Sequence, residues 1–516
     1  MKPPPLDRPG LVAALLFVLA LSILFARLGE GHLANFDDCY YAEKAKEMVR
    51  GGDWLTPHFA GTPRLDNPPL FLWLQSVAFL VLGVNDRAAI FWSALSGALC
   101  IPILYRLARL RLGLDPFESW SAATVLLTTQ YFLKYARHAM FDVFLTLLFL
   151  VAIYAYVRAV QGERRSFLLL GLATGLGILT KSVLGLFPLT VAVVHLLATG
   201  RGRTLRDGWL LGGLGVAALV AAPWYVANFL RSGGQLLEEH FRWLLWQRGL
   251  GIGGGVRPWW SYLDYLRELG QVYWPWLPLA VAGLVIAIRE TAAPAPAVAA
   301  TAPASTAAAA PAVAAPWSRR DTALLLLLWL FTVVGIMSLG AEKKLWYVMT
   351  AFPCLALLAG LAAGAWIRGE SLRRRVEVGG FALCGAAALA LWLFPIPLSK
   401  ERRPDLQRMA IAARAQVPPG ATLLNLDAGY WRTVNQFLYY SDHDITQPLR
   451  DPALVRRGLQ EGGVALLSAD GFASVAEGDT AAYSVIAASG AWRIVRTRPP
   501  SGAPESRPAR LTPAPG

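Results

Sequence analysis

Charged side chains are scarce in this sequence of 516 residues: they make up 16% of the chain, whereas 55% of its residues are hydrophobic. Soluble globular proteins contain roughly a quarter charged residues. The deficit therefore indicates that lipid, rather than water, surrounds much of the chain. The 19 Trp and 16 Tyr agree with this, because both side chains favour the interfaces of a membrane.

Cysteine is also rare, with four residues and no CxxC pair, so neither a disulfide framework nor a zinc site is indicated. The six histidines form no metal-ligand spacing, and a phosphate-binding GxxxxGKS/T loop is absent. The absence of this loop argues against nucleotide-driven transport. The net charge of +14 does not indicate a nucleic-acid partner, because the arginines form short clusters between apolar runs, as in cytoplasmic loops of membrane proteins.

Apolar segments of spanning or near-spanning length recur along the chain. A helix needs roughly 20 residues to cross a bilayer, with about 17 as a practical minimum. We predict eleven spans, the first of them an uncleaved N-terminal helix and the fifth abbreviated. They lie near 11–27, 88–105, 119–135, 139–157, 166–180, 183–199, 208–230, 273–289, 321–340, 345–367 and 376–395.

Segment 68–83 (PPLFLWLQSVAFLVLG) decides the topology, because it is apolar but only about 16 residues long. If it does not cross, the arginine clusters between the later spans all fall on the inner side, as the positive-inside rule requires. If it crossed, every cluster would lie outside. We therefore predict that 68–83 lies on the outer surface, with the N-terminus inside and the C-terminus outside.

This topology divides the chain into a membrane part, 1–398, and a C-terminal part. The first outer loop should hold two surface helices, 68–83 and 40–50, the second of which has an interfacial amphipathic pattern. Strand-like runs ATLLNL, GVALLSA, AYSVIAA and WRIVRT predict a small outer-face α/β domain after the membrane part. The remaining predicted boundaries are 28–87 and 231–272 for the two outer loops, 291–316 for a low-complexity cytoplasmic linker, 399–498 for the α/β domain and 499–516 for a disordered tail.

Ionisable residues gather near the outer face. Such groups at membrane depth are costly and indicate function, and carboxylates beside amines suit a reaction that deprotonates a nucleophile and releases an anion. Each also has an ordinary alternative: a solvated loop pair, a snorkelling lysine, an ion pair or a plain loop charge. Their convergence on one face is the stronger signal. The residues are Asp37, Asp38, Arg64, Asp66, Arg137, His138, Asp142, Lys181, Glu342, Lys343 and Lys344.

Several blocks of sequence, in a fixed order, carry a family resemblance. They are 37–75 (DDCYYAEKAKEMVRGGDWLTPHFAGTPRLDNPPLFLWLQ), 136–149 (ARHAMFDVFLTLLF), 171–188 (GLATGLGILTKSVLGLFP), 222–226 (APWYV) and 343–360 (KKLWYVMTAFPCLALLAG). Together they resemble bacterial glycosyltransferases related to protein O-mannosyltransferases and to the lipid A aminoarabinose transferase, over roughly residues 10–395. The first block is highly specific, whereas APWYV alone is not.

The resemblance implies an α-helical polytopic membrane fold of the GT-C type, with about 11 to 13 transmembrane helices and a polyprenyl-phosphate sugar as donor. The family's first-loop motif is Asp followed by Glu, and its first acid, the proposed base, corresponds to Asp37, with Asp38 after it. The family's Lys before the double proline is Asn67 here, which removes one expected phosphate contact. Its His before Pro-Trp in the second outer loop is Arg257, which can still bind a phosphate.

We therefore predict a glycosyltransferase that moves a sugar, with inversion, from polyprenyl phosphate to an envelope acceptor: lipid A, a glycolipid, a polysaccharide or a protein. The predicted catalytic residues are Asp37 and Asp38. The predicted donor-phosphate ligands are Lys343, Lys344, Lys181, Arg137 and Arg257. The predicted substrate groove comprises Tyr40, Tyr41, Trp54, Asp66, His138, Asp142 and Tyr347.

We expect no cofactor, because the donor is already activated and cationic side chains neutralise its phosphate, although Asp37 and Asp38 could bind a divalent metal. The expected location is the bacterial inner membrane, with the active site and the C-terminus on the periplasmic side. The alternative is a secondary transporter or a lipid flippase, which predicts internal repeats and broken helices near the midplane. No convincing repeat is found. An assembly protein would not explain Lys181 and Asp142 within the membrane.

Overall fold

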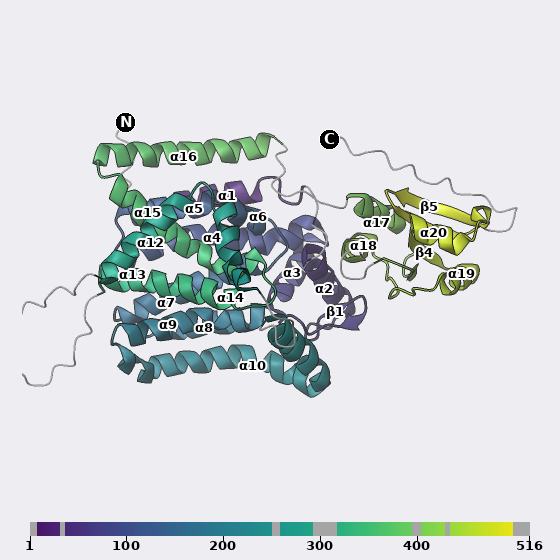
Figure 1. The fold of residues 1–516 in the computed structure, drawn as a ribbon, viewed down its shortest axis with the longest axis horizontal. Helices are drawn as coiled ribbons and strands as arrows, with labels where there is room; N and C mark the ends of the chain where they lie inside the picture. The colour runs from purple at the N-terminus through teal and green to yellow at the C-terminus, as the bar shows by residue number, and fades with distance from the viewer. Residues whose placement is uncertain are drawn as a thin grey trace, which may run out of the picture.

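The computed structural model of the protein describes residues 8–30, 33, 37–249, 258–292, 317–394, 404–428 and 434–498. Two parts are visible: a bundle of long helices and a smaller α/β part near the C-terminus (Figure 1). The bundle helices are α1 (Pro9–Phe25), α4 (Asp86–Leu110), α5 (Pro116–Thr128), α6 (Gln130–Ala136), α7 (Asp142–Val160), α8 (Ser166–Lys181), α9 (Phe187–Ala198), α10 (Gly208–Leu236), α12 (Leu277–Ala292), α13 (Arg319–Leu330), α14 (Ile336–Ser338), α15 (Phe352–Trp366) and α16 (Glu370–Leu393).

Seven described helical stretches are long and apolar enough to cross a membrane, which confirms a multi-pass membrane protein. They are Asp86–Leu110, Asp142–Val160, Ser166–Ala198, Gly208–Trp243, Arg319–Ser338, Leu345–Trp366 and Glu370–Leu393. The predicted spans near 11–27, 119–135 and 273–289 correspond to shorter helices, α1, α5 with α6, and α12. The count of eleven spans stays a prediction.

Glycine sets the closest helix contacts in the bundle. A Cβ atom added to Gly171 on α8 would lie 1.9 Å from the carbonyl oxygen of Gly213 on α10, and one added to Gly283 on α12 would lie 1.8 Å from that of Leu358 on α15. Lipid chains are as apolar as leucine, so helices in a membrane associate through close packing of small residues rather than through the hydrophobic effect. These glycines therefore fix α8 against α10 and α12 against α15.

The arginine clusters of separate loops are joined by ion pairs at one end of the bundle. They connect the loop after α4 to the loop after α7, the loop after α9 to the start of α13, and the start of α5 to the starts of α13 and α16. The pairs are Arg111–Glu163 at 2.8 Å, Arg201–Asp321 at 2.5 Å, Arg319–Glu118 at 3.0 Å and Arg373–Asp115 at 2.9 Å. The clusters predicted on the inner side thus share one end.

The opposite end carries the first loop. There, α2 (Asp37–Gly51), the hairpin β1 (His58–Phe59) and β2 (Thr62–Pro63), and α3 (Leu70–Leu82) lie beside the C-terminal part (Figure 1). We call this end the loop end. With 13 residues, α3 is about 20 Å long, which is less than the hydrocarbon thickness of a bilayer.

The prediction that 40–50 forms an interfacial surface helix is wrong. Every side chain of α2 from Asp38 to Lys46 is buried, the charged ones included. The helix packs against α3 on one side and against α18 (Val434–Ser441) of the C-terminal part on another. Its polar side therefore faces protein, which the pattern of residues 40–50 alone does not show.

The second outer loop begins where α10 kinks at Ser232, whose φ of −152° and ψ of 53° are not helical. A π-helical stretch, Leu237–Gly249, follows, and α11 (Asp264–Val272) leads back to the bundle. Aromatic side chains in this region are exposed, among them Trp246, Trp259 and Trp260. Interfacial lipid is the expected environment of such rings.

The C-terminal part contains a four-stranded sheet in the order β3-β4-β6-β5. Strands β3 and β4 are parallel and the other pairs antiparallel, with a bulge between Val485 and Ala487. Strands β3, β4 and β6 lie within the strand-like runs of the sequence, and β5 extends one residue beyond the run AYSVIAA, to Ser489. The bounds are α17 (Pro404–Gln416), β3 (Leu423–Asn425), α19 (Pro452–Gln460), β4 (Val464–Ser468), α20 (Ala469–Ala476), β5 (Tyr483–Ser489) and β6 (Trp492–Thr497).

Candidate active site at the loop end

Two carboxylates open helix α2. Asp37 is its first residue and half-buried, at the helix end where the backbone dipole favours a negative charge. Asp38 is 3% exposed, and its carboxylate lies 2.7 Å from Nδ1 of His138, in the turn before α7. The His138 ring stacks on Tyr135 with centroids 5.1 Å apart. The two acids thus differ: Asp38 is held by a buried imidazole, whereas Asp37 is more accessible.

A buried ion pair lies next to these acids. Asp142, the first residue of α7, pairs with Lys181, the last residue of α8. The ammonium group of Lys181 also lies 4.5 Å from the ring centroid of Tyr347 and 4.9 Å from that of Phe141. Aromatic ring faces attract cations. The Phe141 ring in turn packs on Tyr41 of α2, with centroids 4.7 Å apart. Lys181 is therefore a cation fixed beside the first loop.

A second buried pair was missed by the sequence analysis. Lys44, which is 0% exposed, places its ammonium 2.5 Å from the Asp66 carboxylate, which also accepts a 2.9 Å hydrogen bond from the Tyr40 hydroxyl. Burial alone would raise the pKa of Asp66, but the Lys44 charge and these hydrogen bonds hold that pKa below its ordinary value. The side chain of Asn67 donates to the same carboxylate at 2.8 Å. The spacing of Tyr40 and Lys44, four residues apart on one helix face, was the available signal.

Two predicted phosphate ligands, Arg137 and Lys343, have different surroundings. The Arg137 guanidinium donates to the backbone carbonyls of Leu24, Ala26 and Arg27 at the end of α1, at 2.8, 2.7 and 3.3 Å. This anchors α1, and a phosphate would have to compete for it. The Lys343 ammonium donates to the Gly340 carbonyl at 2.9 Å and lies over the Tyr262 ring.

Lys344, of the same predicted set, is more accessible. The Lys344 side chain is 39% exposed, 3.7 Å from Glu342. Arg257 lies outside the described residues.

Trp54, a residue of the predicted substrate groove, is half-buried. Its backbone carbonyl accepts a hydrogen bond from the Trp73 indole at 2.5 Å, so it holds the loop between α2 and β1 in place. The roles predicted for these side chains stay predictions.

An apolar groove of about 440 Å³ opens between α8, α9 and α10. Near its Tyr225 end lies a polar cluster that the sequence analysis also missed. Nε2 of His240 is 2.9 Å from the Ser182 hydroxyl and 3.3 Å from that of Tyr225, while Nδ1 is 3.1 Å from the Leu65 carbonyl oxygen. Ser182 follows Lys181 directly, so this polar cluster joins the Tyr225 end of the groove to the residue next to the buried cation.

Metal ligands do not gather in the described part of the chain, where no three His, Cys, Asp or Glu side chains are placed to hold one ion. The site as it stands consists of acids at the start of α2, a buried imidazole, fixed ammonium groups and aromatic rings. Such a set can accept a proton and hold an anionic group.

The fold defines a class of protein: a polytopic membrane protein of the GT-C type. The crystal structure of ArnT from Cupriavidus metallidurans bound to undecaprenyl phosphate superimposes on it with a TM-score of 0.73 at 19% sequence identity, covering 95% of this chain and 99% of that one. A family model described as dolichyl-phosphate-mannose-protein mannosyltransferase matches residues 66–226.

Curated relatives agree with the fold. The undecaprenyl phosphate-alpha-4-amino-4-deoxy-L-arabinose arabinosyl transferase of Pseudomonas paraeruginosa is 31% identical over 382 residues, covering 71% of this chain and 62% of the relative. The protein of that name from Pseudomonas aeruginosa is 29% identical over 384 residues, with 72% and 62% covered. The chain thus spans less than two thirds of these relatives. The resemblance to glycosyltransferases related to O-mannosyltransferases and the aminoarabinose transferase is confirmed.

Proposed function

We propose that this protein is a glycosyltransferase that moves a sugar from a polyprenyl-phosphate donor to a cell-envelope acceptor. One observation carries the proposal: the acidic start of α2 and the fixed cation Lys181 are joined through Tyr41 and Phe141 at one end of a membrane bundle. An acid that accepts a proton and a cation that holds a phosphate are the two groups that this transfer requires. The names of the curated relatives support the same chemistry.

In the proposed mechanism, Asp37 accepts the proton of the acceptor hydroxyl as the oxygen attacks the anomeric carbon, with inversion. Asp38 cannot take this part as readily, because it is buried against His138. The bond between the anomeric carbon and the phosphate oxygen breaks, and both of its electrons leave with the polyprenyl phosphate. Lys181 and the exposed Lys344 would stabilise the dianion that forms.

The donor would enter from the bilayer. The groove between α8, α9 and α10 is lined almost wholly by apolar side chains and is open to the lipid side of α10. Its Tyr225 end lies against His240, which contacts Ser182, so a polyprenyl chain in the groove would present its phosphate on the side of Lys181. We propose that the site lies on the periplasmic face of the inner membrane, because the arginine clusters lie at the opposite end of the bundle. The proposed transfer requires no metal.

The proposed sugar class follows the relatives and the family model: an amino-pentose or a hexose on a polyprenyl phosphate. The acceptor is lipid A, a glycolipid, a polysaccharide or a protein. A secondary transporter or lipid flippase is not favoured, because the curated relatives are transferases.

Mass spectrometry of envelope lipids and glycans tests the proposal, in cells that lack the gene and in cells complemented with the wild type or with Asp37→Asn. We expect one glycan or lipid to gain a single sugar only in the wild-type complement. Purified protein in lipid nanodiscs should then transfer that sugar from its polyprenyl phosphate. Identical spectra in all three strains would overturn the proposal.

A further inference from the structure

A buried lysine of helix α2 binds the C-terminal part. Lys46 is 1% exposed, and its ammonium donates to the carbonyls of Leu438 and Tyr439, at 2.9 and 3.2 Å, and contacts the Asp442 carboxylate at 3.1 Å. The two carbonyls belong to the last turn of α18, where backbone carbonyls lack partners within the helix and a cation is favoured. A lysine of the first loop therefore caps a helix nearly 400 residues away in sequence.

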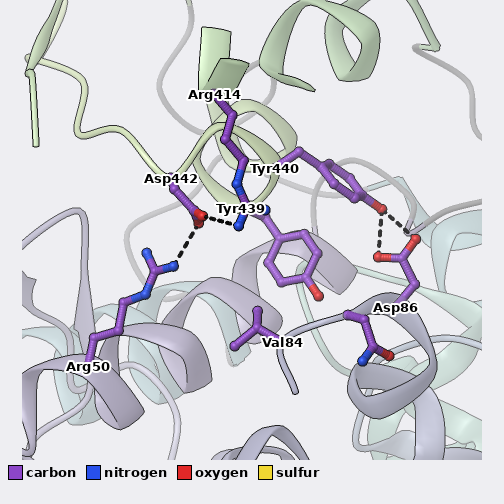
Figure 2. Close-up of a pocket in the computed structure, with 8 residues that line it drawn as sticks. Arg50, Val84, Asp86, Arg414, Tyr439, Tyr440 and Asp442 are labelled. Carbon is purple, nitrogen blue, oxygen red and sulfur yellow. Dashed lines mark hydrogen bonds and ion pairs between the residues drawn. The ribbon is translucent and has the colours of Figure 1, made fainter. Parts of the chain in front are cut away.

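Asp442 joins three elements. Besides Lys46, its carboxylate binds Arg50 of α2 at 3.0 Å and Arg414 of α17 at 3.1 Å (Figure 2). The backbone of Asp442 has a φ of +60°, the left-handed conformation that often ends a helix. Burial would raise the pKa of Asp442, but the neighbouring Arg50 and Lys46 keep it below its ordinary value, so the Asp442 carboxylate is ionised at neutral pH.

Tyr440 links helix α18 to the chain segment that precedes Asp37. Its hydroxyl accepts a 2.9 Å hydrogen bond from the backbone amide of Leu33, four residues before Asp37, and donates to the Asp86 carboxylate at the start of α4 (Figure 2). Helix α18 thus contacts the first loop before Asp37, at Leu33, and after it, at Lys46 and Arg50. The segment that carries the acids is held from both sides.

We propose that the C-terminal part is a brace that sets the position of α2, with Lys46 as its positioning residue; this rests on the proposed role of Asp37. Lys46 is nine residues after Asp37, which is about 13 Å along a rigid helix, so a shift at Lys46 displaces the acid. Lys46 is the buried cation of this network, whereas Arg50 and Arg414 are partly exposed, and a buried ion pair specifies one orientation of a contact more than it adds adhesion. A misplacement of about 1 Å at a reacting group can cost roughly 100-fold in rate.

The experiment uses the full chain in lipid nanodiscs, with Lys46→Met, Lys46→Arg, Asp442→Asn and Tyr440→Phe. Arg457→Met is the matched control, because Arg457 is an exposed cation of the C-terminal part. Two quantities are measured: hydrogen exchange of the amides in 37–51, and kcat and KM for the lipid-linked donor. For Lys46→Met we expect faster exchange in 37–51, a kcat roughly 10- to 100-fold lower and a donor KM within about twofold.

Lys46→Arg should recover much of the rate, since it keeps the cation that caps α18, and Arg457→Met should resemble the wild type. If Lys46→Met does not fold, Asp442→Asn and Tyr440→Phe give the same two readings. Unchanged exchange in 37–51 would overturn the brace. Faster exchange in 37–51 at an unchanged kcat would overturn the positioning role of Lys46. A rise in the acceptor KM alone would also overturn it, and would indicate that this region binds the acceptor instead. A wild type without transfer would refute the proposed function while the exchange data still decide on the brace.

Discussion

The Asp38 carboxylate and Nδ1 of His138 lie 2.7 Å apart, both buried, at the point where α2 meets the turn before α7. The contact fixes the orientation of the His138 ring, with Nδ1 directed at the Asp38 carboxylate. The pair links the first loop to the helices that carry Lys181 and Asp142. We therefore expect the Asp38–His138 contact to hold the start of α2, and with it Asp37, in position.

A double-mutant cycle tests this coupling. Asp38→Asn and His138→Gln should each lower kcat/KM by an amount equivalent to about 1.5–3 kcal/mol, the usual range for a hydrogen bond to a charged group. The double variant should cost clearly less than the sum, because the second substitution removes a partner that is already lost. Additive losses would show that the two side chains act independently.

A pH dependence of stability is expected from Glu47 of α2. Its carboxylate accepts hydrogen bonds from the amides of Ala60 and Gly61, at 2.5 and 3.1 Å, yet burial and the nearby Glu43 raise its pKa to about 7. A folded-state pKa above the unfolded value means that protonation stabilises the fold. The contribution is full below about pH 4.5 and is lost as the pH rises through 7.

The measurement is the apparent Tm of the purified protein between pH 5 and 8. The wild type should lose stability across this range, by up to about 3 kcal/mol. Glu47→Gln should flatten the dependence, while Glu461→Gln, at an exposed position, should leave it unchanged. A wild-type Tm that does not fall with rising pH would contradict the expectation.

The α8–α10 contact should tolerate no added methyl group. In Gly171→Ala the new Cβ meets the Gly213 carbonyl oxygen at 1.9 Å, so the helices must separate, at a cost of about 1–3 kcal/mol. Transfer should fall as well, since Lys181 ends α8. Gly215→Ala, on α10, serves as the control, because a Cβ atom added there has no other atom within 4 Å. Thermal unfolding in detergent compares them, and equal Tm values for both variants would refute the packing argument.

Orientation in the membrane is tested by cysteine labelling with an impermeant reagent. Cysteines introduced at Ala60 and Asp479 should react from outside, and one at Gly162 only after permeabilisation. Labelling of position 162 from outside would reverse the topology and remove the site from the periplasmic face.

Sequence reasoning succeeded where helix order alone determines position. Asp142 and Lys181 lie at opposite ends of two consecutive predicted helices, so the alternation of spans places them on one face, and the structure pairs them. It failed where distant chain segments decide. Lys44 and Lys46 have the pattern of solvent-facing residues on a surface helix, because nothing in residues 40–50 reveals that Asp66 will bind Lys44 or that α18 will cover Lys46.

Arg137 illustrates the same limit for a predicted ligand. A cation beside His138 at a helix end suggests a phosphate contact, yet the unpaired carbonyls at the end of α1 take its hydrogen bonds. The lengths of spans are limited in a related way: the run 119–135 is continuous in hydropathy but the helix breaks at Thr129, between α5 and α6. Local backbone geometry of this kind leaves no mark on the apolar pattern.

The role of Asp37 as the base is tested most directly by Asp37→Asn, which keeps the shape of the side chain and removes its basicity. The measurement is kcat for sugar transfer by the purified protein in nanodiscs, with Asp38→Asn as the comparison. General-base catalysis contributes typically 10²–10⁴-fold, so Asp37→Asn should lose about that much while Tm stays close to the wild type. Asp38→Asn should lose less. If Asp37→Asn transfers sugar at the wild-type rate, Asp37 is not the base and the proposed mechanism is wrong.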